Sequence, residues 1–193
     1  MFAYVFYSVH LRWRYRTRPE DWPVLALVFG SVFPDVVDKP LAWQFGLFES
    51  GYAAAHSVFV AVPISLVAVA VATRYGRPQM SAAFVTGYVL HLVGDVLPVS
   101  LSRSQPYLDP VLWPLADPHH TDHAAIGESF LDGVRGLFDQ YVAQLVTMEI
   151  TAVLALQLGS VTFGTALWIF DGRPGVGLPT NAVRNVLGRD RVR

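Results

Sequence analysis

The 193-residue chain contains no cysteine and only one lysine, and just 15% of its residues are charged. The absence of cysteine excludes disulfide bonds, thiolate metal sites and a cysteine nucleophile, so any metal must be bound by histidine nitrogen and carboxylate oxygen. The formal net charge of −1 argues against a nucleic-acid-binding protein that relies on overall basicity. We therefore expect no nucleic-acid partner.

Three common enzyme signatures are also missing. The glycine-rich stretch "DGRPGVG", residues 171–177, lacks the lysine and hydroxyl of a phosphate-binding loop. No G-x-S-x-G nucleophile turn and no H-E-x-x-H zinc helix occurs anywhere in the chain. We interpret the glycine-rich stretch as the turn that ends the last apolar segment.

The chain is instead rich in apolar residues, which make up 53% of it and exceed the roughly 45–50% of ordinary soluble domains. Segments 52–73, 81–101 and 141–170 reach the length of about 20 residues that a membrane-spanning helix needs. A weaker segment, 22–33, is interrupted by "PDVVDKP", and continuing it to residue 48 would give one broken crossing. These four segments indicate a protein embedded in a membrane.

The N-terminal stretch "MFAYVFYSVHLRWRYR" is aromatic and then arginine-rich, which is typical of a helix in or at the membrane interface. Together these features predict an all-α polytopic membrane protein with about four crossing segments plus this N-terminal helix. We expect residues 1–175 to form a single domain with a long outer loop at 102–140. Residues 176–193 are expected to form a basic C-terminal tail.

Arginine placement predicts the orientation, because basic loops stay in the cytoplasm. If segment 22–48 crosses once and the later segments alternate, eleven of the thirteen arginines fall on one side of the membrane. The opposite side then receives the acidic stretch 102–140. We therefore predict a multi-pass protein of the plasma membrane with a cytoplasmic C-terminus, in contact with membrane lipid; its oligomeric state is left open.

This topology brings a few polar residues to a similar depth in the outer half of the membrane. His91 and Asp95 are four residues apart and share one helix face, while Asp35, Asp38 and His56 come from two other segments. Each has an ordinary interpretation: a structural clamp for His91 and Asp95, a core histidine for His56, a turn residue for Asp35, and an interfacial pair of Asp38 with an outward-reaching lysine. Their convergence favours a metal site, since histidine and carboxylate suit zinc, manganese or iron.

A second cluster occurs in the acidic outer loop, in the sequence "ADPHHTDH". A solvated polar loop is the plain interpretation of this stretch. An auxiliary metal site is the alternative, and its ligands would be His119, His120, Asp122 and His123.

Three elements, "GSVFPDVVDKPLAW", "SGYAAAHSVF" and "GYVLHLVGDVL", followed by "LDPVLWPL", resemble the YdjM-like family of predicted membrane-bound metal-dependent hydrolases, particularly its archaeal members. The resemblance covers roughly residues 4–174 and keeps the order and spacing of the motifs. It implies a multi-span helical protein with a metal centre. The matching positions are Asp35 and Asp38 in the first element, His56 and Ser57 in the second, and His91 and Asp95 in the third.

From the residues and this resemblance we predict a membrane-bound metal-dependent hydrolase that acts on a phosphodiester or a phospholipid-type substrate. Its divalent ion, zinc by preference with manganese or iron as alternatives, would be bound by Asp35, His56, His91 and Asp95. Asp38 would act as general base or orient a histidine ligand. The rival interpretation is a non-catalytic membrane protein whose His/Asp cluster is a structural packing network or an ion pathway.

Overall fold

The structure is a computed structural model, and it describes residues 1–103, 105–116, 130–146 and 152–177. Every regular element within these ranges is a helix, which confirms the predicted all-α class. In chain order the helices are α1 (Phe2–Arg14), α2 (Asp21–Trp43), α3 (Val58–Arg74), α4 (Pro78–Arg103), the short 3-10 helix η1 (Asp109–Val111), α5 (Phe130–Val146) and α6 (Ala152–Phe170).

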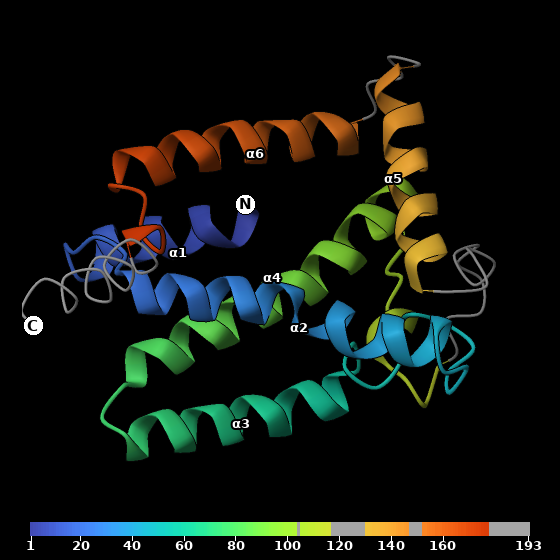
Figure 1. The fold of residues 1–193 in the computed structure, drawn as a ribbon, viewed down its shortest axis with the longest axis horizontal. Helices are drawn as coiled ribbons and strands as arrows, with labels where there is room; N and C mark the ends of the chain where they lie inside the picture. The colour runs from blue at the N-terminus through green and yellow to red at the C-terminus, as the bar shows by residue number, and fades with distance from the viewer. Residues whose placement is uncertain (104, 117–129, 147–151, 178–193) are drawn as a thin grey trace, which may run out of the picture.

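Most of the helices run along the long axis of the molecule (Figure 1). Helices α1, α2, α3 and α6 follow this axis, α4 crosses α2 obliquely, and α5 lies across the others at one end. The C-terminal end of α1, the start of α2, the α3–α4 hairpin and the end of α6 all lie at the opposite end. The last turn of α1, with Arg12 and Arg14, and the last turn of α3, with Arg74, therefore lie at the same end of the molecule.

The most extensive helix packing in the structure joins α2 to α4, and two glycines allow it. A Cβ atom on Gly30 would collide with the backbone carbonyl of Phe84, and one on Gly87 would collide with the backbone carbonyl of Leu27. The two backbones touch at this crossing, as small residues permit in membrane helices. Gly94, further along α4, has open space around it.

Helix α2 contains Pro34 and Pro40 and nevertheless continues from Asp21 to Trp43. Each proline lacks the N–H that would bond to the carbonyl four residues earlier, which weakens the helix locally without ending it here. The predicted break within "PDVVDKP" is therefore wrong. A consequence is that Asp35 and Lys39 lie one turn apart on a helix instead of in an irregular loop.

Two other predicted segments begin or end differently. Residues 52–57 form a loop, and α3 begins only at Val58, after Ser57 accepts a hydrogen bond from the backbone N–H of Phe59 as its N-cap. The predicted single segment 141–170 is divided between α5 and α6, which run in different directions (Figure 1). Since α5 starts at Phe130, the predicted outer loop at 102–140 also contains helical residues.

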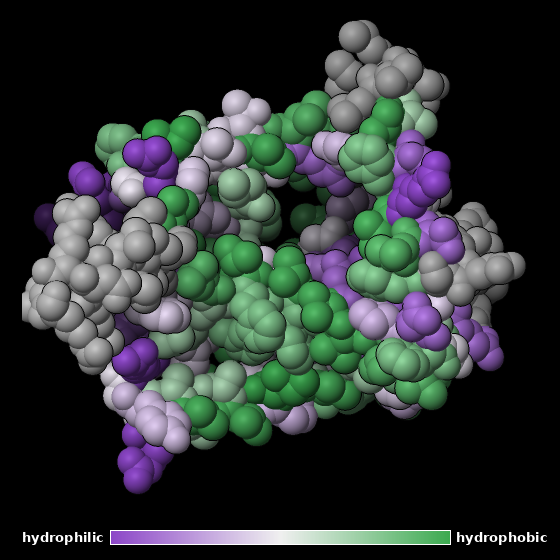
Figure 2. Space-filling view, viewed as in Figure 1, coloured by the Kyte–Doolittle hydropathy of each residue, from purple (hydrophilic) through white to green (hydrophobic). Residues whose placement is uncertain are grey.

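The surface carries many large apolar side chains in the open, such as Phe29, Val62, Leu66 and Phe163. In Figure 2 apolar residues cover the middle of the visible face, and polar residues gather towards its two ends. Among the described residues one helix, at Pro78–Leu101, is long and apolar enough to cross a membrane, and two apolar helices are shorter, at Val58–Arg74 and Leu154–Phe170. The predicted segment 81–101 thus lies within a helix of sufficient length.

A buried carboxylate ties α1 to the end of α6. Asp171 accepts hydrogen bonds from the hydroxyls of Tyr4 and Ser8, both 2.6 Å long, and it pairs with Arg12. Burial alone would raise the pKa of the Asp171 carboxyl, but the bonds from Ser8, Tyr4 and Arg12 outweigh it and hold this pKa below its usual value. The sequence carried no sign of this long-range connection.

Candidate metal centre

Three separate pieces of chain bring four potential metal ligands together. Asp35 comes from α2, His56 from the loop before α3, and His91 with Asp95 from one face of α4. The ligand atoms of Asp35, His56 and His91 all lie within 4.8 Å of one another. The sequence predicted this convergence from depth alone, and the fold brings these residues into direct contact.

Five distances between ligand atoms of these four residues lie between 3.3 and 3.8 Å. His91 Nε2 lies 3.4 Å from His56 Nε2 and 3.3 Å from Asp95 Oδ2. Asp35 Oδ1 and Asp95 Oδ2 lie 3.5 and 3.6 Å from His56 Nε2, and Asp35 Oδ2 lies 3.8 Å from His91 Nε2. A tetrahedral zinc site with metal–ligand bonds of about 2.0–2.1 Å has ligand–ligand distances of about 3.3–3.4 Å. The cluster is therefore close to the required size.

The third aspartate of this region, Asp38, is fully buried and binds the loop before α3. Its carboxylate accepts hydrogen bonds from the backbone N–H groups of Ala53, Ala55 and His56, at 2.9 to 3.0 Å. These bonds satisfy the loop backbone without a helical turn, which explains why residues 52–57 are not helical. Asp38 thus fixes the position of the loop that carries His56.

Asp38 also fixes the ring of His56. Its Oδ2 lies 2.8 Å from His56 Nδ1, a distance at which Nδ1–H donates to the carboxylate; when the ring is neutral, this tautomer presents the lone pair of Nε2 to the cluster. This carboxylate–histidine arrangement is the one that commonly orients metal-binding histidines. Tyr52 packs edge-on against the same ring, with centroids 4.8 Å apart.

The chemistry of the donor set fits a cation. Nε2 of His56 faces carboxylate oxygens of Asp35 and Asp95, and all of these atoms are acceptors in this protonation state. Asp95 Oδ2 is buried and has no hydrogen-bond partner among the described residues. A buried acceptor without a donor is costly, and a metal ion at the centre of the cluster would satisfy it.

Lys39 differs from its predicted position. Instead of reaching outward to the membrane surface, its ammonium lies 2.6 Å from Asp35 Oδ1, one helical turn away. The side chain also lies beside the ring of Trp43, with the ammonium 5.8 Å from the ring centroid. The continuity of α2 through Pro40 explains the difference, because it holds Lys39 and Asp35 on one face.

The site is also supported by contacts that the sequence analysis did not predict. The hydroxyl of Tyr88 donates to the carbonyl of Ala55, and the hydroxyl of Ser57 donates to the carbonyl of Trp113. Tyr88 stands three residues before His91 and could have been placed on the same helix face from its spacing. Nothing in the sequence pointed to Tyr52 or to the carbonyl of Trp113.

His119, His120, Asp122 and His123 fall outside the described residues, and so does the tail from residue 178 onward.

Comparison with known proteins supports the motif-based resemblance. The sequence model of the YdjM inner membrane protein family matches residues 2–170. No curated protein and no solved structure matches the chain significantly. Because the matched range covers most of its 193 residues, the chain belongs to the YdjM inner membrane protein family.

Proposed function

We propose that this protein is a membrane-bound metal-dependent hydrolase whose divalent ion is bound by Asp35, His56, His91 and Asp95. The observation that carries the proposal is the close spacing of their ligand atoms, which lie 3.3 to 3.8 Å apart in the pairs described above, near the ligand–ligand distance of a zinc site. Two imidazole nitrogens and two carboxylates form a donor set typical of zinc, which we propose as the preferred metal.

The charge of the cluster supports a divalent ion. Three carboxylates, of Asp35, Asp38 and Asp95, surround neutral imidazoles, and one ammonium, of Lys39, lies at the edge. When these groups are ionised, two negative charges remain uncompensated. Uncompensated charge inside a membrane protein is costly, and one divalent cation would neutralise it.

When bound, a zinc ion would polarise a phosphoryl oxygen and lower the pKa of a bound water to near neutrality. The residues of the chain would supply the rest. His56 and His91 would hold the ion from two different segments, and Asp38 would keep the Nε2 lone pair of His56 directed at it. The complete burial of Asp38 and its four hydrogen bonds favour this orienting role over the role of general base.

A phosphodiester or phospholipid-type substrate is consistent with a membrane location. Lys39 Nζ lies beside Asp35 and would place a positive charge next to the metal, where a phosphate group would approach. The substrate class itself rests on the resemblance to metal-dependent hydrolases, and on the family's membrane environment.

We also propose the predicted topology, with α2, α3, α4 and α6 as the four crossings. These helices alternate in direction along the long axis, and the arginine-bearing ends gather at one end of the molecule (Figure 1). By the positive-inside rule that end, which includes the end of α6, would be cytoplasmic. The metal centre would then lie in the outer half of the plasma membrane.

Elemental analysis of detergent-purified protein tests the proposal. We expect about one zinc per chain in the wild type and strong loss of metal in Asp35→Ala and His91→Ala. Asp139→Ala is a matched control, because Asp139 lies on the exposed surface of α5. Wild-type protein without stoichiometric metal would contradict the proposal and favour a packing network or an ion pathway. If metal is present, chelator-sensitive cleavage of a soluble phosphodiester separates a catalyst from a purely structural metal site.

A further inference from the structure

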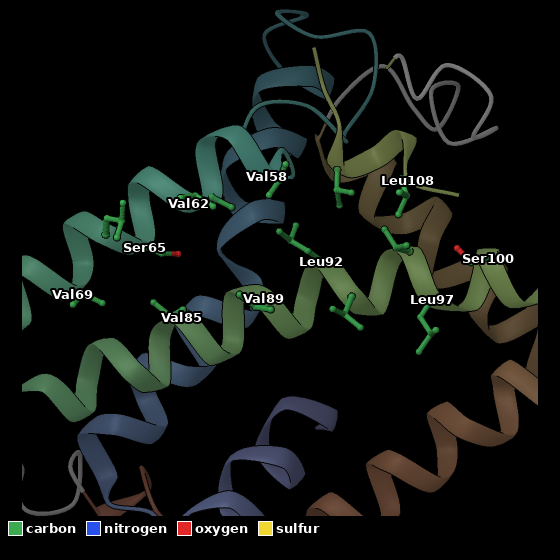
Figure 3. Close-up of a pocket in the computed structure, with 15 residues that line it drawn as sticks. Val58, Val62, Ser65, Val69, Val85, Val89, Leu92, Leu97, Ser100 and Leu108 are labelled. Atoms are coloured by element: carbon green, nitrogen blue, oxygen red, sulfur yellow. The ribbon is translucent and has the colours of Figure 1, made fainter. Parts of the chain in front are cut away.

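A groove of about 620 Å³ lies between α3 and α4 (Figure 3). Val58, Val62 and Val69 line it from α3, and Val89 and Leu97 line it from α4. Within the described part of the chain, no charged residue lines the groove, and its only polar side chains are those of two serines. Many of the lining side chains are also exposed at the surface, so the groove is open along its length and apolar throughout.

The two helices that form the groove are not parallel, so its hairpin end is called the narrow end and the opposite end the wide end. Helices α3 and α4 meet at their hairpin and diverge towards the other end of the molecule (Figure 1). Val69 and Val85 lie towards the narrow end, and Leu108, just before η1, lies at the wide end (Figure 3). A flexible chain could therefore enter from the wide end and follow the helices towards the hairpin.

The wide part of the groove lies next to the candidate metal centre in the chain. Val58 comes two residues after His56, and the groove residues Leu92 and Val96 directly follow His91 and Asp95. Helix α4 therefore presents the metal ligands on one face and the groove on another at the same level. The groove and the centre share two walls, α4 and the chain around the start of α3.

We propose that this groove binds one acyl chain of a membrane lipid, with the tail towards the hairpin and the polar headgroup at the wide end. From Val58 to Val69 the groove follows eleven residues of helix, or about 16 Å at 1.5 Å per residue. One leaflet is about 15 Å thick, half of a hydrocarbon core of about 30 Å. A chain from the outer leaflet fits this length, and its headgroup would lie at the depth of the metal centre.

This inference deepens the proposed function and rests on it for one point, that the bound lipid is the substrate. A wall of valine and leucine recognises an acyl chain by apolar contact and would not select a particular headgroup. The substrate class would accordingly be a long-chain lipid with a phosphodiester headgroup. A water-soluble phosphodiester would not need the groove.

Photocrosslinking in lipid nanodiscs tests the groove directly. The probe is a phospholipid with a diazirine on its acyl chain, and the variants are Val62→Trp and Val89→Trp, which fill the groove from its two walls. Val67→Trp is the matched control, since Val67 lies on α3 outside the groove and is 62% exposed. We expect saturable labelling of α3 and α4 in wild type and control, and at least a fivefold decrease in both groove variants, with unchanged metal content.

Several outcomes would overturn the inference. If excess unlabelled lipid does not reduce the labelling, or if the labelled residues are spread evenly around α3 and α4, the probe has reacted from bulk lipid and not from the groove. A change of oligomeric state in both groove variants but not in the control would identify the groove as an interface between copies of the chain.

A second assay separates this inference from the proposed function. We expect both groove variants to cleave long-chain phospholipid at least tenfold more slowly and a soluble bis-aryl phosphodiester at the wild-type rate. Equal losses on both substrates would contradict the assignment of the groove to the lipid substrate. Wild-type protein without metal that still labels saturably would instead refute the hydrolase and leave the groove as a lipid-binding site.

Discussion

The orienting role of Asp38 gives the sharpest quantitative prediction. In the variant Asp38→Asn one carboxylate oxygen becomes an amide nitrogen. If the remaining oxygen takes the place of Oδ2, it can still accept from the groups of Ala53 and His56 that bond there, at 2.8 to 3.0 Å. The new amide then faces the N–H of Ala55, which bonds to Oδ1 at 2.9 Å in the wild type. One buried donor loses its acceptor, and the charge behind His56 is lost.

The size of the effect follows from these contacts. An unsatisfied buried donor costs about 1–3 kcal/mol, a fraction of the 5–15 kcal/mol of a typical folded protein, so we expect the variant to fold. Loss of the partner of a metal-binding histidine usually weakens metal affinity about 10–100-fold. This decrease corresponds to about 1.4–2.7 kcal/mol in the free energy of metal binding.

Zinc affinity can be measured by competition with a chromogenic chelator in detergent. The control is Asp139→Asn, which removes the same charge from an exposed position of α5. We expect the control to bind zinc like the wild type. Affinity of Asp38→Asn within a factor of two of the wild type would refute the argument that Asp38 holds His56 for a metal.

Three other predictions follow from contacts described above. Gly87→Ala should lower the free energy of unfolding by several kcal/mol, because the new Cβ would collide with the backbone of α2. Gly94→Ala has open space for its Cβ and should be neutral or stabilising by up to about 1 kcal/mol. Thermal unfolding of the two variants tests this difference. Asp171→Asn should be destabilising at pH 6, because a carboxyl with a lowered pKa stabilises the fold at pH values above its unfolded-state pKa of about 4. The difference in stability from the wild type should decrease as the pH falls below about 4. Melting temperatures at several pH values test this, and a difference that does not change with pH would contradict it. Lys39→Met should tighten zinc binding roughly tenfold, because the ammonium repels the ion and competes with it for the Asp35 carboxylate. Unchanged zinc affinity in the chelator titration would show that Lys39 does not compete with the metal.

The convergence of the candidate ligands could be predicted from the sequence. Local periodicity placed His91 and Asp95 on one helix face, and the alternation of apolar segments placed Asp35 and His56 at the same depth. Both arguments use the regular geometry of helices in membranes, where length and direction are strongly restricted. The close approach at Gly87 could be expected for the same reason, since small residues mark helix contacts.

The parts that could not be predicted depend on contacts between distant residues. The loop at 52–57 is apolar enough to continue a helix, and it is Asp38, more than a dozen residues earlier, that takes up its backbone N–H groups. Pro40 suggested a break, but packing against α4 outweighs the local cost of the proline. No proline marks the division between α5 and α6, and the single charged residue between them, Glu149, did not distinguish it from an apolar span.

The backbone contact between α2 and α4 has a consequence for how such a site can vary in sequence. Gly30 and Gly87 fix the point where the helices cross, and the ligands Asp35 and His91 follow at offsets of five and four residues. A single residue inserted between Gly30 and Asp35 would rotate the carboxylate by about 100° around the helix and move it away from the cluster. Insertions between the end of α2 and the loop at 52–57, in contrast, would leave this crossing intact. These two short offsets therefore set the position of each ligand relative to the helix crossing. Relatives that keep the site should preserve both offsets even where the connecting loops differ in length.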